Sequence, residues 1–199
     1  MEISIIISNF NNEKFILRCI RSVLNQSFDK NEFEVIVIDD ASTDKSPQYI
    51  QSIENNIIPI YNDTNIGLSA SCNYGVKTAR GKFCVFIDSD DFVNRNLLLT
   101  EHDFLSHNKD NMDACSCDYY EVSIKEEIIR RRDGMAYPIR CGIMYYTDHL
   151  RELGPYNVGE KREDIDFRKR FLHTGRYIYN IPIPYYRYTQ HNNSITKNP

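Results

Sequence analysis

The stretch Lys82-Phe83-Cys84-Val85-Phe86-Ile87-Asp88-Ser89-Asp90-Asp91 joins a short apolar run to a cluster of acids. The apolar part is rich in aromatic and β-branched residues, which predicts a buried strand of a parallel sheet. Ligands of open α/β sheets bind in the crevice beyond the carboxyl ends of the strands. These carboxylates are therefore expected at the mouth of that crevice rather than in the core. Clustered carboxylates repel one another unless a cation joins them, and oxygen ligands suit Mg²⁺ or Mn²⁺. The alternative is a solvated acidic turn, for which Asp and Ser are ordinary residues.

The segments before this stretch alternate between strand and helix patterns. The expected strands cover residues 2–8, 33–38, 57–61 and 82–87, with apolar residues at helical spacing between them. Pro59 indicates that the third strand lies at an edge or carries a bulge. Strands that alternate with helices predict the α/β class, with a mostly parallel central sheet covered by helices on both faces.

The pattern changes after Asp91, and a smaller antiparallel part is expected there. Helices are predicted near residues 97–105, 148–153 and 163–172, and strands at 114–122, 144–147, 177–181 and 185–188. Residues 125–133 combine acids with three arginines, which favours a solvated hairpin or helix face over a phosphate site. We expect one domain over residues 1–199.

Length and composition exclude several classes of protein. The 199 residues carry a net charge of −4, which argues against non-specific binding of nucleic acid because phosphate neutralisation needs excess Lys and Arg. No run approaches the ~20 apolar residues of a membrane span, and the first residues do not resemble a signal peptide. We therefore expect a cytoplasmic protein. Its six cysteines contain no C-x-x-C pair, which favours free structural thiols.

Several short motifs follow the predicted strands, and their order resembles that of the family 2 glycosyltransferases, which have the GT-A fold. The matched motifs extend from about residue 3 to residue 196. They are Ile5-Ile6-Ile7-Ser8-Asn9-Phe10-Asn11, Ser22-Val23-Leu24-Asn25-Gln26-Ser27, Asp39-Asp40-Ala41-Ser42-Thr43-Asp44, Asn65-Ile66-Gly67, Gly81, Asp88-Ser89-Asp90-Asp91 and Glu163-Asp164.

This resemblance implies a donor site for a nucleoside diphosphate sugar, with UDP-sugar as the expected donor. The residues implied to bind it are Ser8, Phe10, Asp40, Asn65, Gly67, Asp88 and Ser89. Phe10 is expected near the base, and Asp40 is expected to accept a hydrogen bond from it. Because a carboxylate cannot donate, this contact favours a base edge with an N–H, as uracil has.

The resemblance also implies a divalent cation, Mn²⁺ or Mg²⁺, at the acidic cluster. Asp88 and Asp90 would form the D-x-D pair, with Asp91 as a substitute ligand. His191 matches a histidine that can approach the metal or the diphosphate in related enzymes. The alternative for His191 is an ordinary surface position beside two asparagines.

Transfer to an acceptor hydroxyl needs a general base, because hydroxyls are poor nucleophiles at neutral pH. The resemblance implies Asp164 as that base, with Glu163 as the second choice, and a direct displacement that inverts the anomeric centre. The alternative is that both acids simply favour a helix N-terminus. Arg168 and Arg170 remain open between diphosphate contacts and pairing along the helix.

Two features depart from the family. Cys72 stands where relatives commonly have an arginine, which leaves open how the Asn65-Ile66-Gly67 loop holds the donor. The chain ends soon after His191, so we expect a small, open acceptor site that a second copy or a partner protein completes. The resemblance implies a donor half at residues 1–93 and an acceptor and base half at 94–199. It also implies glycan or polysaccharide synthesis on a glycan or lipid-linked glycan, with possible contact at the inner membrane face.

Two other functions fit parts of the sequence. A phospho-accepting receiver domain would explain Asp39-Asp40 after an apolar strand, but it needs a lysine after a late strand, and none is convincingly placed. A non-catalytic metal- or sugar-binding module would keep the acids without transfer. The helix–loop–helix calcium pattern fails, because Phe92 and Leu99 stand where oxygen ligands are required.

Overall fold

The computed structural model describes residues 1–109, 111–154, 156–159 and 162–191. Its strands are β1 (Ile3–Asn9), β2 (Phe33–Asp39), β3 (Ile58–Tyr61), β4 (Phe83–Asp88), β5 (Phe92–Val93), β6 (Ala114–Ser123), β7 (Ile128–Arg132), β8 (Ile143–Tyr146) and β9 (Ile178–Gln190). Its helices are α1 (Ile16–Leu24), α2 (Ser46–Gln51), the 3₁₀ turn η1 (Glu54–Asn56), α3 (Leu68–Thr78), α4 (Leu97–His107), α5 (Thr147–Leu153) and α6 (Glu163–His173).

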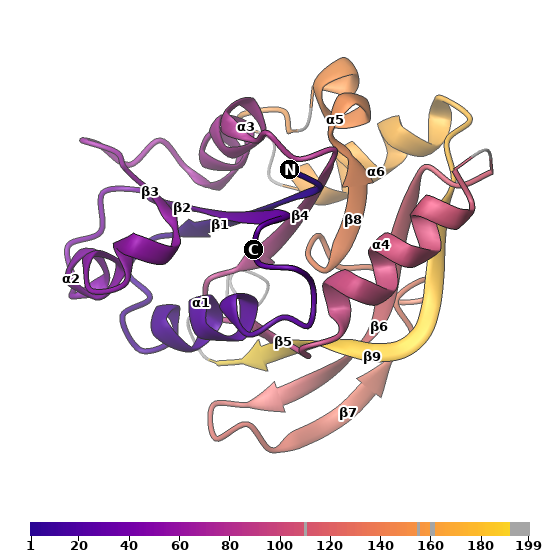
Figure 1. Ribbon diagram of the computed structural model, residues 1–199. Helices are drawn as coiled ribbons and strands as arrows, with labels where there is room; N and C mark the ends of the chain where they lie inside the picture. The colour runs from indigo at the N-terminus through magenta and orange to yellow at the C-terminus, as the bar shows by residue number, and fades with distance from the viewer. Residues whose placement is uncertain (110, 155, 160–161, 192–199) are drawn as a thin grey trace.

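All these strands belong to one curled sheet, in the order β3-β2-β1-β4-β8-β6-β9-β5, with β7 paired to β6 (Figure 1). The first four strands in this order are mutually parallel. All seven residues of β2 are buried, as expected for strands with both faces covered. β3 lies at the edge, where Pro59 costs no ladder hydrogen bond on the open side.

The second half of the chain extends the sheet mostly with antiparallel pairs. β8 is antiparallel to both β4 and β6, and β5 and β7 are antiparallel to their neighbours. β9 runs parallel to β6. The predicted α/β fold, with a parallel core and a smaller antiparallel part, is confirmed.

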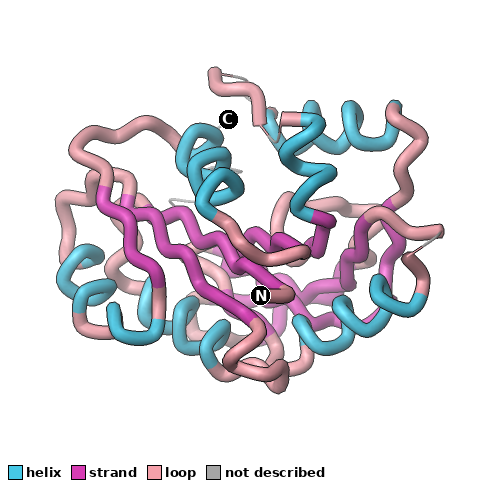
Figure 2. The backbone as a smooth tube through the Cα atoms, turned by 45° about the horizontal axis from the view of Figure 1, so that its top comes forward, coloured by secondary structure: helices cyan, strands magenta, loops and turns pink. Residues whose placement is uncertain are grey.

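Helices cover both faces of the sheet (Figure 2). α3, α5 and α6 lie on one face, and α1, α2 and α4 lie on the other. α3 approaches β1 closely at Gly75, where an added Cβ would lie 2.5 Å from Ile6 Cγ2. A larger residue at this position would therefore push the helix away from the central strand.

The prediction of two tyrosine-rich strands near the end of the chain is wrong. The structure has one strand, β9, which pairs with β6 on both sides of an irregularity. Cys117 pairs with Ile181, whereas the next residue, Asp118, pairs with Pro184. The bulge takes up Pro182 and Ile183, so the proline that interrupts the sequence pattern does not end the strand.

Two smaller predictions have clear outcomes. All six cysteines are free and buried. Residues 125–133 form an exposed hairpin whose arginines pair with acids of β6, such as Arg131 with Asp118. Within the described ranges, no helix has both the length and the apolar character needed to cross a bilayer.

Candidate active site

The candidate site lies where the central parallel strands end. In the register of the sheet, Ser8 of β1 stands between Ile38 of β2 and Asp88 of β4. Polar residues follow all three strands, and parallel strands present their carboxyl ends at one edge. The sequence motifs that are far apart in the chain are therefore neighbours here, at the place where α/β sheets bind ligands.

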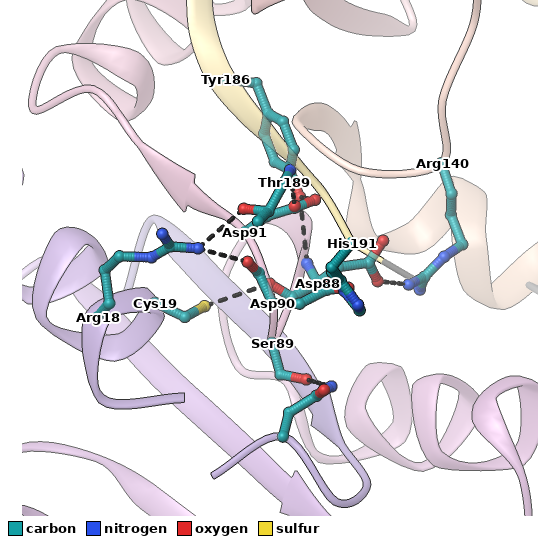
Figure 3. A network of polar contacts seen from close by, with 11 residues as sticks. Arg18, Cys19, Asp88, Ser89, Asp90, Asp91, Arg140, Tyr186, Thr189 and His191 are labelled. Carbon is teal, nitrogen blue, oxygen red and sulfur yellow. Dashed lines mark hydrogen bonds and ion pairs between the residues drawn. The ribbon is translucent and has the colours of Figure 1, made fainter. Parts of the chain in front are cut away.

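Three carboxylates gather at the end of β4 (Figure 3). One oxygen from each of Asp88, Asp90 and Asp91 lies within 4.8 Å of the others. The side chains of Asp88 and Asp90 are 30% and 22% exposed, so a ligand can reach them. An all-oxygen donor set at this spacing fits a hard divalent cation such as Mg²⁺ or Mn²⁺.

Asp91 differs from the other two acids because it is buried, with only 1% of the residue exposed. Its oxygens accept hydrogen bonds of 2.7 Å from the Tyr186 hydroxyl and 2.7 Å from the Thr189 backbone N–H. Burial, together with the charge of Asp90, raises the pKa of Asp91 well above its ordinary value. The expectation that all three acids lie at the mouth is therefore wrong for Asp91, which ties β9 to the end of β4.

His191, just after β9, also reaches this cluster. Its Nε2 lies 2.7 Å from Asp90 Oδ2, and its ring stacks on Phe15 at 5.1 Å between centroids. The side chain is only 11% exposed. His191 is thus not an ordinary surface residue, and its role as a metal ligand stays a prediction.

An arginine side chain that no sequence motif marks lies on the other side of the acidic cluster. Arg140, in the segment before β8, pairs through Nη2 with Asp88 Oδ1 and donates from Nη1 to Cys72 Sγ at 3.0 Å. Its side chain is 8% exposed. The one signal for it in the sequence is Cys72, where the resemblance implies an arginine.

Asp40 holds the Asn65-Ile66-Gly67 loop. Its carboxylate accepts hydrogen bonds from the backbone N–H groups of Ile66 and Gly67, at 2.9 and 2.8 Å, and from Asn62 Nδ2 at 2.8 Å. Gly67 has a φ of +86°, which favours glycine. Asp40 is only 2% exposed, and these three contacts use three of the about four lone-pair positions of a carboxylate, so its contact with a base stays a prediction.

The other predicted donor-binding residues are distributed around this loop. Phe10 is 46% exposed at the end of β1, and Ser8 is half-buried. Asn65 is exposed and accepts a hydrogen bond from the Gly67 N–H at 3.0 Å. Ser89 is buried, and its hydroxyl accepts a hydrogen bond of 2.8 Å from Asn12. Ser89 therefore fixes the loop that follows β1 in this structure.

The predicted base opens α6. Asp164 lines a small pocket that it shares with Arg140, Tyr145, Tyr156 and Arg168. Its Oδ1 accepts a hydrogen bond from the Ile165 N–H at 2.8 Å. Arg140 links this pocket to the acidic cluster, because it lines the pocket and pairs with Asp88.

The neighbours of Asp164 on α6 separate into two groups. Glu163 is half-buried, and its charge adds to the burial that raises the pKa of the Cys72 thiol. Arg170 pairs with Asp166 at 2.8 Å, so the pairing alternative holds for this arginine. Arg168 lines the pocket instead, with Nη2 3.5 Å from Met135 Sδ.

Comparisons with known proteins agree with this geometry. A family model described as "Glycosyl transferase family 2" matches residues 4–174. Over 101 residues, 49% of this chain, the sequence is 39% identical to the poly(ribitol-phosphate) beta-N-acetylglucosaminyltransferase TarS of Staphylococcus aureus. Over 107 residues, 51% of this chain, it is 44% identical to the minor teichoic acid biosynthesis protein GgaA of Bacillus subtilis. The matches span 18% and 24% of the length of these two relatives.

The crystal structure of S. aureus TarS residues 1–349 in complex with UDP-GlcNAc has the same fold. It superposes with a TM-score of 0.85 at 25% sequence identity, and the match covers 100% of this chain and 61% of that one. A receiver domain would have the strand order 2-1-3-4-5, whereas this sheet runs 3-2-1-4 before it turns antiparallel. The receiver alternative is therefore set aside.

Proposed function

The chain belongs to glycosyl transferase family 2, and we propose that it transfers a sugar from a nucleoside diphosphate sugar to an acceptor hydroxyl. The observation that carries this proposal is that Arg140 pairs with Asp88 of the acidic cluster and also lines the pocket that contains Asp164. A cation site for a leaving diphosphate and a carboxylate for an attacking hydroxyl are the two groups that such a reaction needs.

The donor proposed is a UDP-sugar. Support comes from the likeness to a structure that contains UDP-GlcNAc. Asp40 would accept a hydrogen bond from the ring N–H of uracil. Phe10 offers an exposed aromatic face for the base. Ser8, Asn65 and Gly67 would contact the nucleoside, and Asp88 the ribose. Ser89 would act through the loop that it fixes.

The cation proposed is Mn²⁺ or Mg²⁺. Asp88 and Asp90 would hold it, with His191 and Asp91 as neighbours that set its position. When bound, the cation neutralises the diphosphate and stabilises the charge that develops as it leaves. The donor set of this chain fits such an ion because the acids bring their oxygens within 4.8 Å of one another.

Asp164 is the proposed general base. The acceptor oxygen attacks the anomeric carbon as its proton passes to the Asp164 carboxylate, and the bond from that carbon to the diphosphate oxygen breaks. The products are the glycosylated acceptor and the nucleoside diphosphate, with inversion at the anomeric carbon. Glu163 is the second candidate for the base.

The acceptor proposed is a surface polymer or its lipid-linked precursor. Relatives are named for poly(ribitol-phosphate) and teichoic acid, which are hydroxyl-bearing phosphate polymers. We assign donor binding to residues 1–93 and acceptor and base to 94–199. A second copy or a partner protein would enlarge the acceptor site, and the reaction would take place in the cytoplasm, at the inner face of the membrane.

The proposal is tested by release of UDP from UDP-GlcNAc and UDP-glucose in the presence of Mn²⁺. We expect slow hydrolysis of at least one donor without acceptor, and faster release with a polyol phosphate acceptor. UDP binding with no release from either donor, in wild type and in Asp164→Asn alike, would contradict transfer and indicate a non-catalytic module.

A further inference from the structure

We propose that Arg140, which contacts both Asp88 and Cys72, binds the diphosphate of the donor. This inference rests on the proposed function, because it assigns a further residue to the same donor site. Arg140 comes from the segment before β8, which no sequence motif marked as part of the site.

Burial of the guanidinium is the first observation. The Arg140 side chain is 8% exposed, and burying a charge is costly unless it is paired and hydrogen-bonded. Among the described residues, its hydrogen-bond acceptors are the Asp88 carboxylate and the Cys72 thiol. A thiol is a weak acceptor, and a guanidinium has five N–H donors. Arg140 therefore keeps donor capacity for an anion while it remains paired with Asp88.

The location of the guanidinium is the second observation. One side of Arg140 contacts Asp88 of the acidic cluster, and the same side chain lines the pocket of Asp164. In a direct displacement, the anomeric carbon lies between the base and the leaving diphosphate. A cation that borders both the acids and the base pocket is placed where the negative charge of the leaving group develops.

The contact with Cys72 is the third observation. Cys72 is buried in α3, and Arg140 Nη1 lies 3.0 Å from its sulfur. The small thiol leaves room for a guanidinium that enters from another segment. Arg140 therefore places its guanidinium beside residue 72, so an arginine at either position can reach this part of the site.

The test compares the binding of uridine and UDP, by calorimetry, in Mn²⁺ and in EDTA. Arg140→Ala should weaken UDP binding by about 10- to 100-fold, the range for loss of a hydrogen bond to a charged group, and should leave uridine within twofold. Arg140→Lys keeps a point charge and should lose less. The matched control is Arg176→Ala, which removes a mostly buried arginine paired with Glu152 and should change neither ligand.

A double variant tests the exchange of positions. Cys72→Arg in the Arg140→Ala background should recover at least tenfold in UDP affinity. A double variant as weak as Arg140→Ala would contradict the claim that both positions serve one point of the site. Thermal melting of each variant identifies any that fails to fold, and Arg140→Lys then decides the first comparison.

The outcomes separate this inference from the proposed function. Equal losses for uridine and UDP would give Arg140 a structural role only, and unchanged UDP binding would remove it from the site. Either result leaves the proposed function in place. A wild-type protein that binds no UDP in Mn²⁺ would overturn both.

Discussion

His191 Nε2 lies 2.7 Å from Asp90 Oδ2, although the two residues are 101 positions apart in the chain. The contact closes the acidic cluster with a residue that follows the last strand, β9. The candidate metal site is therefore built from both halves of the chain. Its geometry depends on β9, which Asp91 holds through Tyr186 and Thr189.

The first prediction concerns this histidine. His191→Gln should lower the apparent affinity for Mn²⁺ by about 10- to 100-fold, the usual cost of losing a group that orients a metal ligand. Mn²⁺ titration in the presence of UDP, followed by calorimetry, measures it. His173→Gln changes an exposed histidine of α6 and serves as the control. Equal Mn²⁺ affinity in wild type and His191→Gln would remove His191 from the metal site.

Asp90 should matter for activity more than for folding. Its side chain is 22% exposed and its charge acts against the ionisation of buried Asp91, so Asp90→Asn removes a repulsion. We expect at least about a 100-fold loss of donor turnover, because the cation supplies several kcal/mol of charge stabilisation. The melting temperature should not fall. Asp29→Asn is an exposed control, and an active Asp90→Asn enzyme would argue against a metal at this cluster.

Asp164 and Asp166 lie in the same first turn of α6, so a comparison of their variants distinguishes a catalytic role from stabilisation of the helix. Asp164→Asn should lower kcat by about 10²- to 10⁴-fold and leave UDP binding unchanged, as expected for a general base. Asp166→Asn removes an acid from the same first turn of α6, where it pairs with Arg170, and should keep its kcat. If both variants lose the same activity, the acids act through the helix dipole or the fold and not as a base.

We expect the buried side chain of Glu101 to make the free energy of unfolding depend on pH. It is fully buried in α4, both carboxylate oxygens lack a hydrogen-bond partner in the described structure, and burial raises its pKa well above the ordinary value. The unfolded state therefore loses this proton at a lower pH than the folded state does. Stability falls as the pH rises above the ordinary pKa of glutamate, toward the raised value.

Glu101→Gln removes this titration. At pH 8 the variant should be more stable than wild type by about 1–3 kcal/mol, and near pH 4 the difference should shrink. Urea unfolding across this pH range measures it, with exposed Glu32→Gln as the control. A difference that does not change with pH would mean that Glu101 is ionised in the folded protein or has a partner.

The parallel core could be predicted because its strands carry their signal locally. β1, β2 and β4 are buried on both faces, so each reads as a continuous apolar run. The acids that follow β4 then mark the edge where ligands bind. The position of Ser8, Asp40 and Asp88 at the ends of these strands predicts that they share one edge of the sheet, and the strand register agrees.

Other features could not be read from local patterns. Arg140 enters the site from an irregular segment, and its pairing with Asp88 depends on how β8 joins β4. The burial of Asp91 depends on Tyr186 of β9, 95 positions later in the chain. The continuity of β9 depends on a bulge against β6, whereas the prolines suggest a break. All three are set by tertiary pairing and not by residue periodicity.

The central claim is that the acids after β4 hold a divalent cation that in turn holds a diphosphate. A crystal structure of the protein with UDP and Mn²⁺, with anomalous scattering measured for manganese, tests it most directly. The account predicts one manganese peak beside Asp88 and Asp90, in contact with diphosphate oxygens, with the uracil next to Asp40. UDP bound at this edge without manganese, or manganese bound away from these acids, would contradict it.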